Sequence, residues 1–567
     1  MEITPLAVIR WLFGPGPRRG PGRLWPRWLF LRALGLIFFS AFYSLLFQIR
    51  GLIGPQGILP ARWYLQMVSH SMGLLRYWFV PSLLWIGSGP VALLLLCWAG
   101  LLASVALVLN LWPRGAIFVC LVAYLSFVSA AQDFSSYQSD GMLLAAGFIC
   151  LFFAPPGLRP GLAESSPPSR ASLFLLQWLW FRIYFESGLV KMASHDPHWR
   201  GLTALYDYYS NGPLPNWIGW YAQQMPHSIN AALALATLVI ELGFVWMVFL
   251  PRQFRILCFC VVTPFQIGII LTANLAFLNH LVLALGILLL DDRFILGVFS
   301  RLRQGLKRGA PEEIASGPDS GGEAVSRDLN RPEFEAVSPV VKPPSAIVVA
   351  WRHVGLVVTA FLLTWVFYSQ STLLLGIMAP GLSLPMTPVT ALEPFRIANQ
   401  YGLFAVMTPA RYEIEFQGSQ DGTHWEAYPF RYKPQDPHQA PRFYAPYQPR
   451  FDWDLWFASL ATWRQYPFVA RTEILLLQND ASVLSLFAGN PFPKTPPRMV
   501  RAMIWQYWFT DLATKRKDET WWKCKLVGLY APEVELLPGG RVGILQMPGG
   551  SNPPQGDPDD DGENGGP

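Results

Sequence analysis

The stretch that decides the fold is Gly89–Leu111, which reads GPVALLLLCWAGLLASVALVLNL and contains no Asp, Glu, Lys or Arg. A helix rises about 1.5 Å per residue, so roughly 20 apolar residues cross a hydrocarbon core about 30 Å thick. This stretch meets both requirements, and we predict that it spans a membrane.

Eight further apolar stretches extend the same prediction along the chain. They are Trp28–Phe47, Ala116–Ala131, Gly141–Ala154, Ser172–Met192, Ile229–Leu250, Ile256–Leu271, Leu275–Leu290 and Ala346–Tyr368. Gly141–Ala154 is short for a span, so it is tilted, re-entrant or longer than drawn here. The sequence therefore predicts a polytopic α-helical membrane bundle of about nine spans.

The distribution of charge separates a membrane part from an aqueous part. The chain is 52% hydrophobic and 14% charged, whereas soluble proteins carry about 25% charged residues. Charges are sparse from about Trp28 to Leu290 and ordinary from Arg396 onward. The net charge of +6 comes largely from basic residues at the ends of apolar stretches. The expected partner is therefore the lipid bilayer, and a nucleic acid partner is not expected.

These observations predict six regions. They are a basic cytoplasmic N-terminus (1–27), the transmembrane bundle (28–300), a disordered cytoplasmic linker (301–344), a final transmembrane helix (345–368), a soluble C-terminal domain (391–542) and a disordered acidic tail (548–567). The linker and the tail contain too few apolar residues to bury a core.

The soluble domain is predicted to be small, α+β and mostly β. The predicted strands are Tyr412–Phe416, Trp425–Tyr432, Trp505–Phe509 and Trp521–Leu529. Asp421-Gly422 is a hairpin-turn signal between the first two. Two segments are predicted to be helical, Phe457–Tyr466 and Glu473–Phe487.

The orientation follows from the positions of the arginines. Five of them precede the first span: Arg10, Arg18, Arg19, Arg23 and Arg27. Cytoplasmic flanks carry an excess of Lys and Arg, so the N-terminus is predicted to be cytoplasmic. With an odd number of spans, the C-terminal domain lies across the membrane. No Asn-x-Ser/Thr sequon occurs, which favours a bacterial inner membrane with a periplasmic domain over an endoplasmic reticulum membrane with a lumenal one.

Short motifs recur in order along both parts of the chain. They are Gly51–Pro60, Trp178–Ile183, Gly188–Lys191, His198–Thr203, Asn274–Asn279, Phe451–Trp453, Gly489–Pro493 and Pro497-Arg498. Together they resemble the lipase maturation factor family of membrane proteins, from about Trp28 to Leu537 without the linker. The motif residues singled out are Gly54, Pro60, Trp199, Arg200, Asn274, Asn279, Asp452, Trp453, Asn490 and Pro491.

The membrane part is also similar to a wider group that includes the vitamin K-dependent carboxylase. The similarity narrows to Gly188–Lys191 followed by Trp199, and it implies that Lys191 matches a lysine that acts as a base. One departure is clear. Family members often carry Leu-Leu-Glu-Thr-Gly-Phe, whereas this chain has Leu-Leu-Ala-Ala-Gly-Phe at 143–148, so that carboxylate is absent or relocated.

Charged residues inside or directly beside the predicted spans form a candidate intramembrane polar cluster. Its members are Arg182, Glu186, Glu241 and Asp140. Each costs at least about 2.5–3.5 kcal/mol at the bilayer centre and therefore needs a partner. Arg182 and Glu186 are four residues apart on one helix face and can pair directly. Either they form a structural ion pair, or they line a polar cavity. Glu241 is expected to pair across helices, with Arg182 as a candidate partner, or to be protonated.

Lys191 near the end of its span has two interpretations. A lysine at a helix end usually snorkels to the interface. A desolvated lysine can instead have a lowered pKa and serve as a base, which is the role that the carboxylase similarity implies.

Other chemistry is not indicated. His195-Asp196-Pro197-His198 offers two possible metal ligands without a third cluster, whereas a metal site normally needs three or four. No hydrolase, zinc-protease or phosphate-loop motif occurs. Neither a metal nor a cofactor is expected.

Three functions remain open. The resemblance implies a non-enzymatic maturation factor that helps exported clients such as lipases to fold. The alternative is a membrane enzyme with Lys191 as base and with Arg182 and Glu186 in its cavity. A transporter is disfavoured because no inverted repeat or pair of broken helices is apparent.

Overall fold

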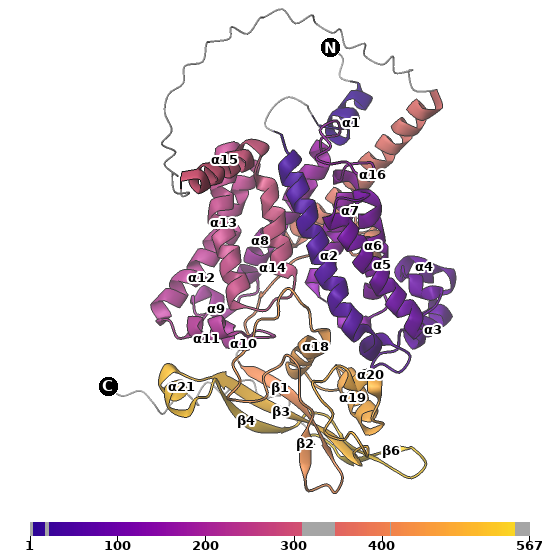
Figure 1. Cartoon of the computed structure of the whole chain (residues 1–567), viewed down its shortest axis with the longest axis vertical. Coiled ribbons are helices and arrows are strands. Elements are labelled where there is room, and N and C mark those ends of the chain that lie inside the picture. Colours follow the sequence, from indigo (N-terminus) through magenta and orange to yellow (C-terminus); the bar gives the residue numbers. More distant parts are fainter. Residues whose placement is uncertain (1–3, 17–21, 136, 309–345, 409, 550–567) are drawn as a thin grey trace, which may run out of the picture.

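The computed structural model describes residues 4–16, 22–135, 137–308, 346–408 and 410–549. A helical bundle forms one end of the molecule, and a sheet domain built from the C-terminal part of the chain covers the other end (Figure 1). The predicted linker from 309 to 344 and the tail from 550 lie outside the described residues.

All nine apolar stretches lie in helices. The helices are α2 (Leu24–Ile53), α5 (Pro90–Val108), α6 (Pro113–Val128), α7 (Gln138–Phe153), α8 (Arg170–Ala193), α12 (His227–Leu242), α13 (Arg252–Thr272), α14 (Leu278–Gly286) and α16 (Ala346–Met378). Two 3-10 turns, η4 (Phe244–Phe249) and η5 (Ile287–Leu289), extend α12 and α14.

The helices differ in their ability to cross a bilayer. In the described part of the chain, five helical segments are long and apolar enough: α2, α5, α12 with η4, α13 and α16. Three more are apolar but shorter: α6, α7 and α14 with η5. The structure therefore supports a helical region with several membrane spans, and a count of nine is not confirmed.

The remaining helices before the sheet domain are mostly short. They are α1 (Pro5–Phe13), α3 (Ala61–Met72), η1 (Gly73–Leu75), α4 (Arg76–Phe79), η2 (Leu83–Trp85), η3 (Gln132–Ser135), α9 (Pro197–Arg200), α10 (Tyr208–Asn211), α11 (Trp217–Gln223), α15 (Asp292–Arg308), α17 (Thr387–Leu392) and η6 (Glu393–Phe395). α15 ends at Arg308, so residues 301–308, which were predicted to belong to the disordered linker, are helical.

Close packing of α2 on α5 shows why small residues occur within these apolar runs. A Cβ atom on Gly35 would come within 2.8 Å of the Val108 side chain, and one on Gly100 would meet the buried Phe42 ring. Glycine at these points lets the two helices approach closely, as is common between membrane helices.

The C-terminal domain contains one antiparallel sheet. Its strands are β1 (Arg411–Ser419), β2 (Trp425–Ala427), β3 (Met499–Phe509), β4 (Trp522–Leu529), β5 (Glu533–Leu536) and β6 (Val542–Gln546). The strand order is β2-β1-β3-β5-β6, and β4 pairs with the later part of β3. The β1–β2 hairpin turns at Gly422, which has a φ of +77°. This confirms the turn predicted from Asp421-Gly422.

α18 (Arg450–Ser459) and α19 (Phe468–Leu477) pack on this sheet. α20 (Ala481–Leu484) contacts α19 and α2, and α21 (Leu512–Asp518) joins β3 to β4. The predicted helix over Phe457–Tyr466 is wrong, since α18 ends at Ser459 and α19 begins after Pro467. The predicted strand from Trp425 stops at Ala427, because Pro429 cannot donate a ladder hydrogen bond.

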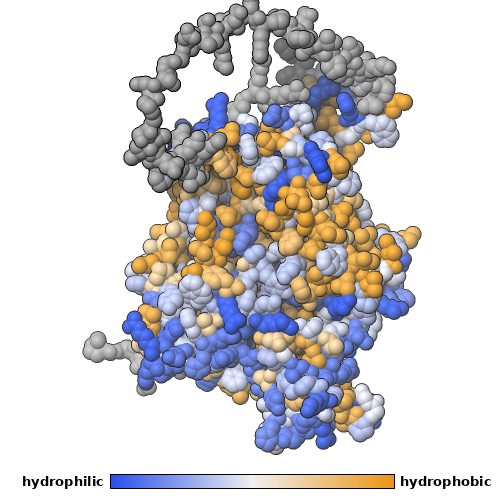
Figure 2. All heavy atoms as spheres, in the orientation of Figure 1, coloured by the Kyte–Doolittle hydropathy of each residue, from blue (hydrophilic) through white to orange (hydrophobic). Residues whose placement is uncertain are grey.

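The surface follows the same division. On the face shown in Figure 2, apolar residues form a broad band across the bundle, and polar residues dominate the sheet domain. α1 and α15 lie at the end of the bundle opposite the sheet (Figure 1).

Candidate functional site

The first buried ion pair lies on α8. Arg182 Nε donates to Glu186 Oε1 at 2.5 Å, and both side chains are fully buried. The pair also holds the segment that leads to the sheet domain. Arg182 Nη2 donates to the Asn399 carbonyl at 2.8 Å, and the Tyr401 backbone N–H donates to Glu186 Oε2 at 2.8 Å.

The second pair joins α8 to α12. Lys191 Nζ lies 2.8 Å from Glu241 Oε1 and 2.7 Å from Oε2, and both residues are buried. This corrects two expectations. The partner of Glu241 is Lys191 rather than Arg182, and Lys191 does not snorkel, since it is only 3% exposed. The Trp199 ring covers the ammonium, with its centroid 4.9 Å away.

A cavity of about 330 Å³ adjoins this pair, between α8, α12, α13 and α14. A chain of polar side chains runs along its wall. The Tyr184 hydroxyl donates to Gln266 Oε1 at 2.5 Å, and Gln266 Nε2 donates to Asn279 Oδ1 at 2.8 Å. Apolar side chains make up most of the remaining lining. Lys191 and Glu241 both line this cavity.

The third pair clamps the sheet domain onto the bundle. Arg450, the first residue of α18, donates to both Asp140 oxygens at 2.8 and 2.9 Å. Its guanidinium also donates to the Tyr124 hydroxyl at 2.9 Å and to the Phe134 carbonyl at 2.7 Å. Asp140 is fully buried on α7. The four residues predicted to form one intramembrane cluster thus belong to three separate ion pairs.

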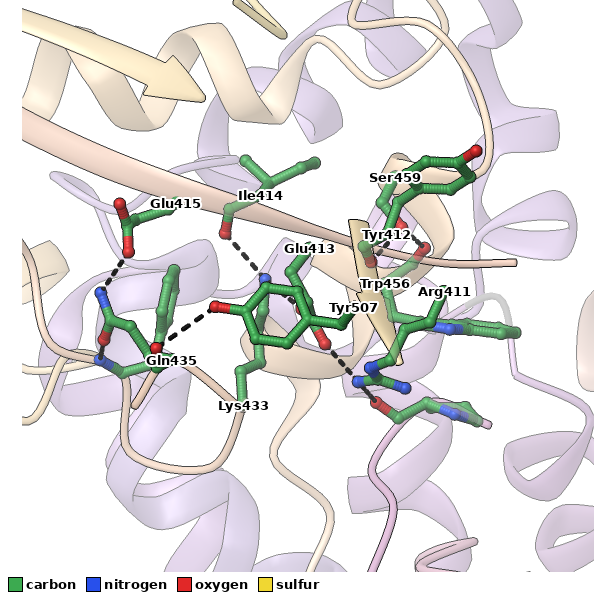
Figure 3. Close-up of polar contacts among 12 residues, drawn as sticks. Arg411, Tyr412, Glu413, Ile414, Glu415, Lys433, Gln435, Trp456, Ser459 and Tyr507 are labelled. Atoms are coloured by element: carbon green, nitrogen blue, oxygen red, sulfur yellow. Dashed lines mark hydrogen bonds and ion pairs between the residues drawn. The ribbon is translucent and has the colours of Figure 1, made fainter. Parts of the chain in front are cut away.

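A fourth group of buried charges lies at the start of β1, where the sheet domain meets the bundle (Figure 3). Arg411 donates to the Ser210 carbonyl at 3.0 Å and to the Pro213 carbonyl at 3.1 Å, both in the loop around α10. Glu413 accepts a hydrogen bond from Arg411 and forms an ion pair with Lys433 at 2.8 Å. These three charged side chains are buried. They fix the edge of the sheet domain against the bundle.

Further polar contacts cross the same boundary. Asn274 Nδ2 donates to the Arg442 carbonyl at 2.7 Å, and its Oδ1 accepts from the Tyr444 N–H at 2.8 Å. Trp456 Nε1 donates to the Asn211 carbonyl at 3.0 Å. The membrane bundle and the sheet domain therefore form one continuous packed body.

The remaining motif residues shape the backbone. Gly54 ends α2, where a Cβ atom would lie 2.2 Å from the Arg50 carbonyl oxygen. Pro60 precedes α3 as its N-cap residue. Asn490 Oδ1 accepts from the Phe492 N–H at 2.9 Å, with Pro491 between them.

Two motif residues differ in their surroundings. Trp453 is buried in α18 and packs against the Tyr137 ring, with centroids 5.6 Å apart. Arg200 is exposed and hydrogen-bonds the His195 ring.

Besides Glu413, the carboxyl groups of Asp452, Asp454 and Glu473 are buried inside the sheet domain. Burial raises the pKa of Asp452 to about 7, against a partial lowering by Lys433. Burial also raises the pKa of Asp454 and of Glu473 well above the ordinary range. These groups favour the neutral form in the folded protein.

Within the described ranges, no group of three or more His, Cys, Asp or Glu side chains is placed to hold a metal ion. The His198 ring lies within hydrogen-bond distance of the Asp196 carboxylate, with Nδ1 3.0 Å from Oδ1. The same carboxylate caps α9 by accepting a hydrogen bond from the His198 backbone N–H at 2.7 Å.

The sequence did not identify the two arginines that bind the bundle from the sheet domain. Arg450 and Arg411 lie in the aqueous part of the chain, where an arginine is ordinarily exposed. Asp140 lies 310 residues from Arg450 in sequence. The one available signal was the uncompensated carboxylate at Asp140 in an apolar stretch, which required a cation from elsewhere.

Comparisons with known proteins cover both parts of the chain. The family profile "Lipase maturation factor transmembrane domain" matches residues 25–297, and "Lipase maturation factor C-terminal domain" matches residues 397–532. The chain is 31% identical to lipase maturation factor 2 of Gallus gallus, over 94% of this chain and 84% of that protein. It is 30% identical to lipase maturation factor 1 of Mus musculus, over 91% of this chain and 88% of that protein. No solved structure matches.

Proposed function

The chain belongs to the lipase maturation factor family, and from this premise we propose that it is a membrane-embedded factor that helps exported client proteins, lipases among them, to fold or assemble. The observation that carries the proposal is that buried polar contacts join the sheet domain to the helical bundle. Arg450–Asp140 and Arg411 with its loop carbonyls hold the sheet domain on the bundle. A client engaged by the sheet would therefore be held at a fixed position beside the membrane.

The sheet offers contacts suited to an incompletely folded chain. Within the described residues, β4 pairs only with β3 and β6 only with β5. Leu526 on β4 is 47% exposed, and Ile544 on β6 is 61% exposed. An open strand edge with apolar side chains can add a strand from another polypeptide. The domain's aromatic residues contribute less, because most of them, such as Phe451 and Phe487, lie in its core.

The proposed orientation places this sheet across the membrane from the cytoplasm. Arg170 binds a backbone carbonyl of α1, which lies at the end of the bundle opposite the sheet (Figure 1), and Arg27 and Arg114 bind carbonyls of the segment between α7 and α8. Clustered arginines are typical of the cytoplasmic side. The sheet would then meet clients in the periplasm or in the lumen of the endoplasmic reticulum.

The proposal is tested by co-expression with a secreted lipase in a host that lacks its own maturation factors. Lipase activity per unit mass of lipase is expected to rise above the empty-vector control, with total lipase mass changing less. An unchanged specific activity, with this chain present in the membrane at normal level, would overturn the proposal.

A second candidate, a membrane enzyme with Lys191 as base, is supported by the cavity beside that residue. It predicts that function requires the lysine itself rather than any cation at this position.

A further inference from the structure

The cavity beside Lys191 opens on the side of the helical bundle, between α12 and α13. Among the residues that line it, Leu233 and Ala236 on α12 and Pro264 and Gly268 on α13 are exposed at the surface of the bundle. Side chains around this opening are apolar and exposed, and they include Ile267 at 41%. An entrance on the apolar flank of membrane helices is accessible from the hydrocarbon core rather than from water.

The interior combines an apolar wall with an unpaired buried donor. The Asn279 side chain is 6% exposed and lines the cavity, and its Nδ2 atom has no hydrogen-bond partner in the described structure. Its Oδ1 is already occupied by Gln266. A buried donor left unpaired costs about 1–3 kcal/mol, so an acceptor in the cavity would be favoured.

The charges at the end of the cavity cancel. Lys191 and Glu241 neutralise each other at 2.7 Å, so a ligand gains little by carrying a net charge into this space. The volume of about 330 Å³ lies within the range of small-molecule sites, about 300–1,000 Å³.

We propose that this cavity binds an acyl-ester lipid from the bilayer. One acyl chain enters between α12 and α13 and lies along the apolar wall, and an ester carbonyl oxygen accepts a hydrogen bond from Asn279 Nδ2. Phospholipids and neutral glycerides share this chemistry. The site is independent of the proposed action on clients.

Gly268 provides a substitution that fills the entrance. A Cβ atom built on it meets no other atom within 4 Å, and the same holds for Gly376 on α16, which does not line the cavity. Gly268→Phe and Gly268→Leu should therefore place a side chain in the opening without a backbone clash. Gly376→Phe is the matched control.

The test uses the full-length protein in vesicles that contain a photoactivatable lipid with a diazirine on one acyl chain. Phosphatidylcholine and diacylglycerol carrying the same chain form separate arms. Cross-linked peptides are expected from α12 and α13 with one or both lipids. Labelling there should fall to background in Gly268→Phe and Gly268→Leu and persist in Gly376→Phe.

The donor is tested separately. Asn279→Leu is expected to raise the lipid concentration for half-maximal labelling by about tenfold, the worth of one hydrogen bond. Thermal unfolding of each variant confirms that it is folded. If folded Gly268→Phe and Gly268→Leu label like the control with both lipids, the proposal is overturned. An unchanged half-maximal concentration in folded Asn279→Leu would overturn the carbonyl contact.

Discussion

Buried charges in this molecule occur as matched partners from different parts of the chain. Removing one partner of such a pair leaves an uncompensated buried charge, which costs about 3–5 kcal/mol, whereas replacing both partners by apolar residues can be nearly neutral. A single substitution at such a pair is therefore expected to destabilise the protein, whereas the double substitution at the same pair is expected to change its stability much less.

The Lys191–Glu241 pair gives the sharpest prediction at this scale. Lys191→Arg keeps the cation and is expected to preserve both protein level and client maturation. Lys191→Met strands Glu241 and should lower the level of membrane-integrated protein, and Lys191→Met with Glu241→Leu should restore much of it. The measurements are immunoblots of membranes and client activity, scored separately. Loss of client maturation in Lys191→Arg at normal protein level would instead favour the enzyme.

A second prediction at this scale concerns pH and Asp452. Its pKa is raised from 3.8 to about 7 by burial, so the folded state retains the proton that the unfolded state releases. The resulting stability is complete below about pH 4 and is lost as pH rises toward about 7, at a cost of up to about 4 kcal/mol. Asp452→Asn should remove this dependence and unfold at a higher temperature than wild type at about pH 8.

Thermal unfolding followed by tryptophan fluorescence at acidic and alkaline pH measures the difference. Asp518→Asn, at an exposed position in α21, is the control and should behave as wild type. Equal pH dependence of Asp452→Asn and wild type would show that burial does not raise the pKa of Asp452.

Sequence reasoning at residue scale found charges but not all of their partners. Arg182 and Glu186 were predicted as a pair because their spacing is local, and they form that pair. Glu241 was assigned the wrong candidate partner, since nothing in the sequence shows which face of α12 meets α8. Pairing across helices depends on helix rotation, which periodicity does not fix in segments that are apolar all round.

At the scale of elements, apolar length predicted where helices occur, and it was less informative about where they end. α16 runs ten residues beyond the predicted end at Tyr368, to Met378. The predicted span stopped early because polar residues such as Gln370 follow Tyr368, and in the structure Gln370 is buried within the helix. In the sheet domain, β5 and β6 were not predicted, since they are only four and five residues long.

The joint between α7 and α18 supports a prediction about interdomain stability. Arg450→Met removes the guanidinium that satisfies Asp140 and is expected to destabilise the protein by about 3–5 kcal/mol. Adding Asp140→Leu to Arg450→Met should recover part of the loss, because the stranded carboxylate is gone. Arg442→Met, at an exposed arginine of the same domain, serves as control and should cost little.

Thermal unfolding and limited proteolysis of the purified protein would report the effect. If Arg450→Met and Arg442→Met unfold at the same temperature, the joint contributes nothing to holding the two parts together.

At the scale of the whole molecule, the sidedness of the two ends can be tested directly. Reporters fused after Ser300 in α15 and after Gly549 beyond the sheet are expected to give opposite sidedness, with the α15 fusion cytoplasmic. The physical reason is the arginine cluster at the α1 and α15 end. Matching signals from the two fusions would contradict the proposed orientation.

The most direct test of the maturation-factor account is pulse–chase recovery of a newly made lipase with this chain. The full-length protein is immunoprecipitated from cells that secrete the lipase, at successive times after a short radioactive pulse. Labelled lipase is expected to co-precipitate at the earliest times and to leave as its enzymatic activity appears, whereas folded, active lipase added to membranes should not bind. Absence of labelled lipase at every time, or equal recovery of the folded enzyme, would contradict the account.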